Sequence, residues 1–131
     1  MKKFFFIVVS VVYVWSATPN RDVSAYMLSL KKEANVEGFS IQRGEEIFFA
    51  TQMKNNQRIS CTSCHTTNVR MSGENIKSGK KISPLAPSVN SHALTDVAEI
   101  KKWLRRNFND VYGREGTALE KGHVLTFLLA Q

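Results

Sequence analysis

The sequence has few of the residues that cross-link a small domain or build tight turns. It contains two cysteines, three prolines and seven glycines among 131 residues. Both cysteines lie within one short stretch, so they offer no disulfide between distant parts of the chain. No segment alternates apolar and polar residues with the period of two that marks a half-buried strand. These absences predict an all-α domain.

Long apolar runs are also scarce. The longest covers residues 4–15 with one interruption at Ser10, which is short of the ~20 residues that a membrane-spanning helix needs. It follows the basic residues Lys2 and Lys3 and ends at the small residue Ser16, a pattern typical of a cleaved secretory signal peptide over residues 1–16. The sequence therefore predicts a soluble protein exported to the periplasm, with an uncleaved membrane anchor as the alternative.

Acidic side chains are in the minority. The chain has 18 basic and 11 acidic residues, and loss of Lys2 and Lys3 with the signal peptide leaves 16 against 11, a net charge of +5. The remaining length, about 115 residues, suffices for one small domain. Basic residues gather at 77–81 and 101–106, either as solvated surface or as a docking face for an acidic redox partner. No nucleic-acid recognition motif is present.

The two cysteines form the pattern Cys61-Thr62-Ser63-Cys64-His65. Each thiol of such a pair can form a thioether with a haem vinyl group, and the adjacent imidazole then binds the iron. A dithiol redox pair would usually stand in a βαβ setting, a zinc site would need four nitrogen or sulfur ligands, and a simple disulfide would leave His65 incidental. Because the export signal supports the first reading, we expect one covalent haem c at Cys61 and Cys64, with His65 as a ligand.

Helical periodicity marks four further segments. They are residues 18–35, a helix capped by Ser40, a helix starting at Thr95-Asp96, and a helix that opens with the capping box Thr117–Glu120 and runs to Leu129. Residues 66–90 show little periodicity, which predicts a long loop. An apolar haem face would provide a surface against which this loop could pack.

This order of elements resembles class I cytochromes c. The resemblance implies several short helices and long loops packed around one covalent haem, and a close crossing of the first and last core helices. The matching residues are Gly44, Phe48, Val124 and Phe127. Gly44 within a helix costs about 1 kcal/mol relative to alanine, so it indicates that another backbone comes close. We divide the chain into the signal peptide 1–16, an N-terminal helical extension 17–39 and a cytochrome c domain 40–131.

The second axial ligand of the iron decides the function. A methionine gives an electron carrier, a second histidine a carrier of low potential, and a weak ligand a site for small gases. The candidates by residue type are Met27, Met53, Met71, His92 and His123. Class I electron carriers take this methionine from well downstream of the haem motif, and no methionine follows Met71. His92 is either a ligand or a surface loop residue, and His123 is expected at or near the surface.

Longer blocks carry a more specific resemblance. They are Gly79–Ser88, Thr95-Asp96, Lys102–Asn107, Val111–Thr117 and Glu120-Lys121. From about Gly44 to the C-terminus the chain resembles the sphaeroides haem protein family of exported monohaem cytochromes. The resemblance implies that Asn107 is the sixth ligand and is released on reduction, so that ferrous haem binds oxygen or nitric oxide. It also implies a di-haem cytochrome c as redox partner. A helix C-cap is the other role that suits Asn107.

Three details of this resemblance concern the surroundings of Asn107. Family members often carry a disulfide between the residue after the asparagine and one eight residues later, where this chain has Phe108 and Gly116. Such a bridge typically stabilises a folded domain by a few kcal/mol. We therefore expect the segment 107–117 to be held less firmly here, unless Phe108 packs in place of the disulfide. Trp103 is expected in the core or at the haem edge, with its N–H on a buried acceptor. By fold analogy, Pro84 and Leu85 orient His65 through a backbone carbonyl.

The sequence thus predicts a monohaem cytochrome c that exchanges electrons with a partner protein and binds a diatomic gas when reduced. A plain electron carrier with a permanent methionine or histidine ligand is the alternative. A haem enzyme would need an open distal face with a positioned acid or base, which no motif supplies. A zinc or thiol module would purify without haem colour.

Overall fold

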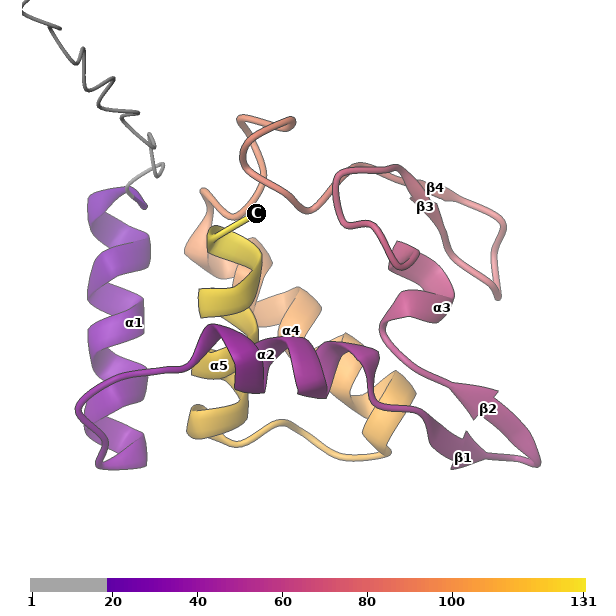
Figure 1. Cartoon of the computed structure of the whole chain (residues 1–131), viewed down its shortest axis with the longest axis horizontal. Coiled ribbons are helices and arrows are strands. Elements are labelled where there is room, and N and C mark those ends of the chain that lie inside the picture. The colour runs from indigo at the N-terminus through magenta and orange to yellow at the C-terminus, as the bar shows by residue number, and fades with distance from the viewer. Residues whose placement is uncertain (1–18) are drawn as a thin grey trace, which may run out of the picture.

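The computed structural model describes residues 19–131, so the predicted signal peptide lies outside the described residues. Within them the chain forms the helices α1 (Arg21–Ala34), α2 (Ile41–Phe49), α3 (Thr62–His65), α4 (Val97–Tyr112) and α5 (Ala118–Leu129). Two short antiparallel hairpins pair β1 (Gln52–Lys54) with β2 (Gln57–Ile59), and β3 (Gly73–Glu74) with β4 (Lys81–Ile82). Figure 1 shows the hairpins on either side of α3, at the opposite end of the molecule from α1.

The helix starts follow the capping residues. The side chain of Ser40 accepts a hydrogen bond from the Arg43 backbone N–H at 3.2 Å, and Asp96 accepts one from Glu99 at 3.0 Å. Thr117 and Glu120 form the predicted capping box at the start of α5. The first helix begins later than expected because Asn20 caps it. All four predicted helices are therefore present. None of the helices within residues 19–131 is long and apolar enough to cross a membrane.

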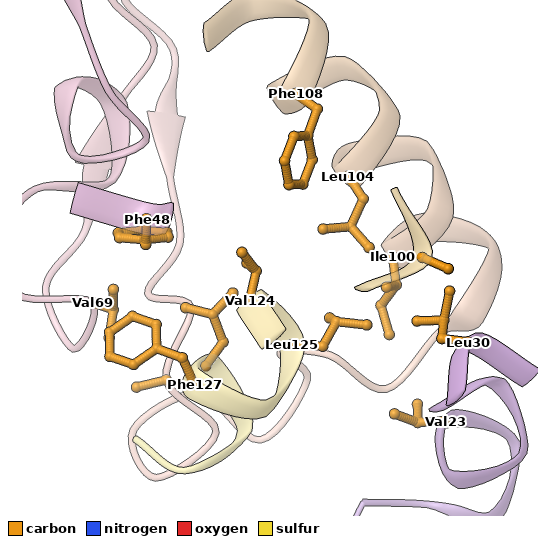
Figure 2. Packing of buried hydrophobic residues seen from close by; sticks show 13 residues of the cluster. Val23, Leu30, Phe48, Val69, Ile100, Leu104, Phe108, Val124, Leu125 and Phe127 are labelled. Carbon is orange, nitrogen blue, oxygen red and sulfur yellow. The ribbon is translucent and has the colours of Figure 1, made fainter. Parts of the chain in front are cut away.

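The crossing of α2 and α5 is confirmed. A Cβ atom on Gly44 would lie 2.0 Å from the backbone oxygen of His123 and 2.6 Å from Cβ of Phe127, so only glycine fits at this position. One turn further along α2, the Phe48 ring stands 5.6 Å from the Phe127 ring, and Figure 2 shows this pair beside Val124. The predicted contact thus consists of a backbone approach and an aromatic pair.

The buried core extends from this crossing to α4 and α1. Figure 2 shows Leu104 and Phe108 of α4 facing α5, with Val23 and Leu30 of α1 at the far side. The predicted loop 66–90 contributes Val69 and contains the β3–β4 hairpin, which strands of two residues are too short to reveal by periodicity. The Val69 carbonyl accepts hydrogen bonds from the backbone N–H groups of Leu85 and Ala86, at 3.0 and 3.1 Å. The loop is thereby folded back on itself over the core.

Candidate haem site

The haem-attachment motif folds into one helical turn. Cys61 precedes α3, and its carbonyl accepts hydrogen bonds from the N–H groups of Cys64 and His65 at 3.3 and 3.1 Å. Residues three apart on a helix share a face, so both sulfurs point the same way. Neither cysteine forms a disulfide, and both are half-buried. The site therefore presents two free thiols together, as thioether attachment requires.

Gly73 of β3 holds the other side of this turn. A Cβ atom there would lie 1.9 Å from the Cys64 carbonyl oxygen. The hairpin therefore lies directly against the motif, a contact that only a glycine permits. Gly73 was predicted only as part of a long loop, although an isolated glycine eight residues after the motif could have indicated this close approach.

The environment of Cys61 disfavours a thiol redox centre. Burial, with a smaller contribution from the neighbouring Cys64, raises the pKa of the Cys61 thiol to about 12. Redox-active dithiols depend instead on a lowered pKa, because the thiolate is the reactive form. The Cys61 thiol stays protonated at neutral pH, which leaves haem attachment as the chemistry that fits this pair.

His65 and Asn107 meet although 42 residues separate them in sequence. The Nδ2 atom of Asn107, on α4, lies 3.4 Å from Nε2 of His65, on α3. Two ligand atoms on opposite sides of one metal ion stand about 4 Å apart, at about 2 Å for each bond. The two side chains therefore lie near the separation that an iron between them would need. Burial lowers the pKa of His65, which favours the neutral imidazole that binds metals.

The other ligand candidates lie elsewhere. Met53 and Met71 are 68% and 60% exposed, and His92 is also exposed. Met27 packs on the core from α1. His123 is half-buried, as expected, and its Nδ1 accepts a hydrogen bond from the Ser40 backbone N–H at 2.9 Å. Asn107 is thus the candidate whose side chain the fold brings to His65, and it lies within α4, whose C-cap is Gly113.

The segment after Asn107 is packed rather than loose. Phe108 is only 5% exposed, and a Cβ atom on Gly116 would lie 2.8 Å from its ring. The ring also stands 5.4 Å from Tyr112, whose hydroxyl donates a hydrogen bond to the Ile47 carbonyl at 2.6 Å. Phe108 and Gly116, the two positions where the family disulfide is often found, therefore contact each other without a covalent bond.

Two predicted contacts are wrong, that of the Trp103 N–H and that of the Pro84 carbonyl. Trp103 is 48% exposed and so lies outside the core, and its N–H donates to the solvent-exposed carboxylate of Glu99 at 3.1 Å, not to a buried acceptor. Its alternative place at the haem edge stays a prediction. Trp103 lies at the margin of the apolar stripe of α4, whose buried residues are Ile100, Leu104, Phe108 and Val111. The Pro84 carbonyl accepts a hydrogen bond from the Asn90 side chain at 2.8 Å, not from His65.

Two lysines near the site make contacts with α4 that the sequence did not indicate, although Lys77 belongs to the basic cluster at 77–81. Lys54, at the end of β1, donates to the backbone carbonyls of Asn109 and Asp110 at 2.8 and 3.0 Å. Lys77, between β3 and β4, forms an ion pair with the Asp110 carboxylate at 2.7 Å. Both contacts reach α4 within three residues of Asn107. Long flexible side chains carry no spacing rule that would predict them.

Known proteins are similar to this chain in both sequence and fold. Residues 34–128 match a family described as a domain of unknown function (DUF1924). The chain is 35% identical over 127 residues to the cytochrome c-type protein SHP of Cereibacter sphaeroides, a match that covers 96% of this chain and 98% of that protein. The similarity therefore spans α1 as well as the haem motif and the terminal helices.

Two solved structures are similar. The structure of oxidised SHP, described as an oxygen binding cytochrome c, superposes with a TM-score of 0.75 at 35% identity and covers 83% of this chain and 96% of that one. The solution structure of cytochrome c'' from Methylophilus methylotrophus, described as giving insights into haem-ligand detachment, has a TM-score of 0.71 at 28% identity. That match covers 84% of this chain and 94% of the other.

Proposed function

Because this chain belongs to the sphaeroides haem protein family of c-type cytochromes and carries covalently attached haem c, we propose that it transfers electrons through an iron whose sixth ligand is labile. Cys61 and Cys64 would hold the haem covalently, and His65 and Asn107 would supply the protein ligands to its iron. Asn107 would be the ligand given up on reduction, which would open the iron to oxygen or nitric oxide.

The observation that carries this proposal is the 3.4 Å approach of Asn107 to His65. It joins the haem motif to the one amide that the sequence resemblance singles out. A half-turn of the terminal amide exchanges the positions of its nitrogen and its oxygen. Asn107 can therefore present an oxygen to the iron without moving its backbone.

The two ligands differ in strength. The haem supplies an iron that passes one electron at a time between ferric and ferrous states. Neutral His65 binds through a ring nitrogen, a ligand that suits iron in both states. A neutral amide oxygen is a hard, weak donor, so it is held better by ferric than by ferrous iron. Reduction would therefore weaken the bond between iron and Asn107, whereas the bond between iron and His65 would persist.

The relatives support the same chemistry. SHP is described as an oxygen binding cytochrome c, and the solution structure of cytochrome c'' concerns haem-ligand detachment. We propose that this chain shares both properties. It acts after export to the periplasm, once residues 1–16 have been removed, and exchanges electrons with another redox protein, for which a di-haem cytochrome c is the candidate.

The optical spectrum tests the proposal. The purified haem protein is recorded oxidised and dithionite-reduced, before and after carbon monoxide, alongside Asn107→Ala and His92→Ala. We expect a low-spin ferric form, a high-spin ferrous form and ready carbon monoxide binding in the wild type and in His92→Ala. Asn107→Ala should be high-spin in both states. A wild-type protein whose ferrous form is low-spin and does not bind carbon monoxide would contradict the proposal.

A further inference from the structure

The two hairpins that flank the haem motif are tied to the same short stretch of α4. The β1–β2 hairpin precedes α3 and the β3–β4 hairpin follows it, as Figure 1 shows. Lys54 comes from the first and Lys77 from the loop of the second. Both ammonium groups reach residues 109–110, two and three positions beyond Asn107.

Lys54 makes the stronger of the two connections. The last carbonyls of a helix carry the negative end of the helix dipole, and most of them lack a partner within the helix. The Lys54 ammonium donates to two carbonyls of the last turn of α4, that of Asn109, which also accepts from the Gly113 N–H at 3.1 Å, and that of Asp110. Hydrogen bonds from a charged donor are about twice as strong as neutral ones. Lys54 as a residue is half-buried; its bond to the Asp110 carbonyl is partly buried, and its bond to the Asn109 carbonyl is exposed.

Lys77 makes a weaker and more exposed connection. Its side chain is 66% exposed and that of Asp110 is 46% exposed. An ion pair in such a setting contributes little and is screened by salt. It nevertheless joins residues 33 positions apart and ties the second hairpin to the same residue of α4 that Lys54 contacts.

Together the contacts restrain the separation of Asn107 from His65. Asn107, Asn109 and Asp110 belong to one continuous helix, so the amide moves only with the helix end or by rotating its own side chain. His65 follows β2 and precedes β3, so its position depends on the two hairpins. We propose that Lys54 and Lys77 are positioning residues that hold Asn107 at the iron and set how readily it leaves. This inference rests on the proposed function.

The test measures how fast Asn107 leaves ferric iron. Imidazole is the probe and is used at about pH 8, where nearly all of it is neutral, so that removal of a lysine charge changes its approach little. At saturating imidazole the observed binding rate reaches a limit set by departure of the native ligand. We expect Lys54→Met to raise this limiting rate about ten-fold, since it removes two charge-assisted hydrogen bonds. Lys54→Arg, which keeps the donors, should stay within about two-fold of the wild type.

The exposed pair gives a smaller and salt-dependent effect. Lys77→Met and Asp110→Asn should each raise the limiting rate about two- to five-fold at low ionic strength. The double variant should behave like either single one, because both remove the same interaction. At about 1 M salt, where the screening length is about 3 Å, the wild type should approach these variants. This salt series needs no mutation and so does not depend on folding of a variant.

Lys121→Met is the matched control. Lys121 pairs with Glu115 at 2.7 Å, the same length as the Lys77 pair, and its side chain is only 17% exposed, but it lies at the start of α5. Its limiting rate should equal that of the wild type. An unchanged rate in Lys54→Met and in the salt series, with Asn107→Ala high-spin, would overturn this inference alone. A low-spin Asn107→Ala would overturn the proposed function.

Discussion

The α2–α5 crossing and the α3–α4 face are built differently. At the crossing, Gly44 lets two backbones touch and buried rings lock them together. At the face, a short helical turn and two small hairpins meet α4 through an amide, an exposed ion pair and one lysine. Close-packed interiors scarcely deform, whereas a few polar contacts at a surface exchange readily with water. On the proposed function, the ligand that must move, Asn107, therefore belongs to the face held by these few polar contacts and not to the crossing.

Phe108 lies between these two regions, so its loss should affect both. Its ring is buried in the core and contacts Gly116. We expect Phe108→Ala to lower the free energy of unfolding by about 3–5 kcal/mol, the usual cost of removing a buried ring. Because Asn107 precedes it on α4, the ferric protein should also become partly high-spin. Denaturant titration measures the first effect and the ferric spectrum the second. A large loss of stability with a fully low-spin spectrum would show that Phe108 supports the core but not the position of Asn107.

Gly44→Ala should damage the crossing alone. The added methyl group would lie 2.0 Å from the His123 carbonyl oxygen, so α2 and α5 must move apart. Such overpacking typically costs about 1–3 kcal/mol of unfolding free energy, and more where the obstacle is backbone. The ferric spectrum should remain low-spin. Gly38→Ala is the matched control, because no atom lies within 4 Å of its added methyl group, and it should be as stable as the wild type.

A mild acid effect should arise at the crossing. Partial burial, with help from the charge of Arg43, lowers the pKa of His123 below its ordinary value of 6.5. Because its pKa is lower in the folded protein, His123 is protonated first in the unfolded chain as the pH falls. The contribution of neutral His123 to the free energy of unfolding is therefore fully present above about pH 6.5, and it is lost as the pH falls through the pKa of the folded state. Protonation also removes the acceptor for the Ser40 N–H.

Thermal unfolding between pH 7.5 and 5 measures this effect. His123→Asn, whose side-chain oxygen can accept the same hydrogen bond, should flatten the curve between these limits. An equally steep curve in that variant would assign the acid effect to another group.

The elements of the crossing were predictable from local sequence, whereas much of the α3–α4 face was not. Ser40 and Thr117 cap their own helices, and Gly44 indicated that some backbone comes close. The resemblance to class I cytochromes c was needed to name α5 as the partner of α2. Asn107 was indicated only by resemblance, since an asparagine near a helix end also suits a cap. Trp103 was misplaced because it occupies the edge of an apolar stripe. The lysine contacts depend on where the hairpins lie, which no local pattern encodes.

We propose above that Asn107 binds ferric iron and leaves on reduction. Crystal structures of the haem protein in the oxidised and dithionite-reduced states would show this ligand in place or displaced. We expect the Asn107 amide oxygen bonded to iron opposite His65 in the oxidised crystal, and withdrawn from it in the reduced one. A methionine or His92 bonded to iron in both states, with Asn107 turned away, would contradict it.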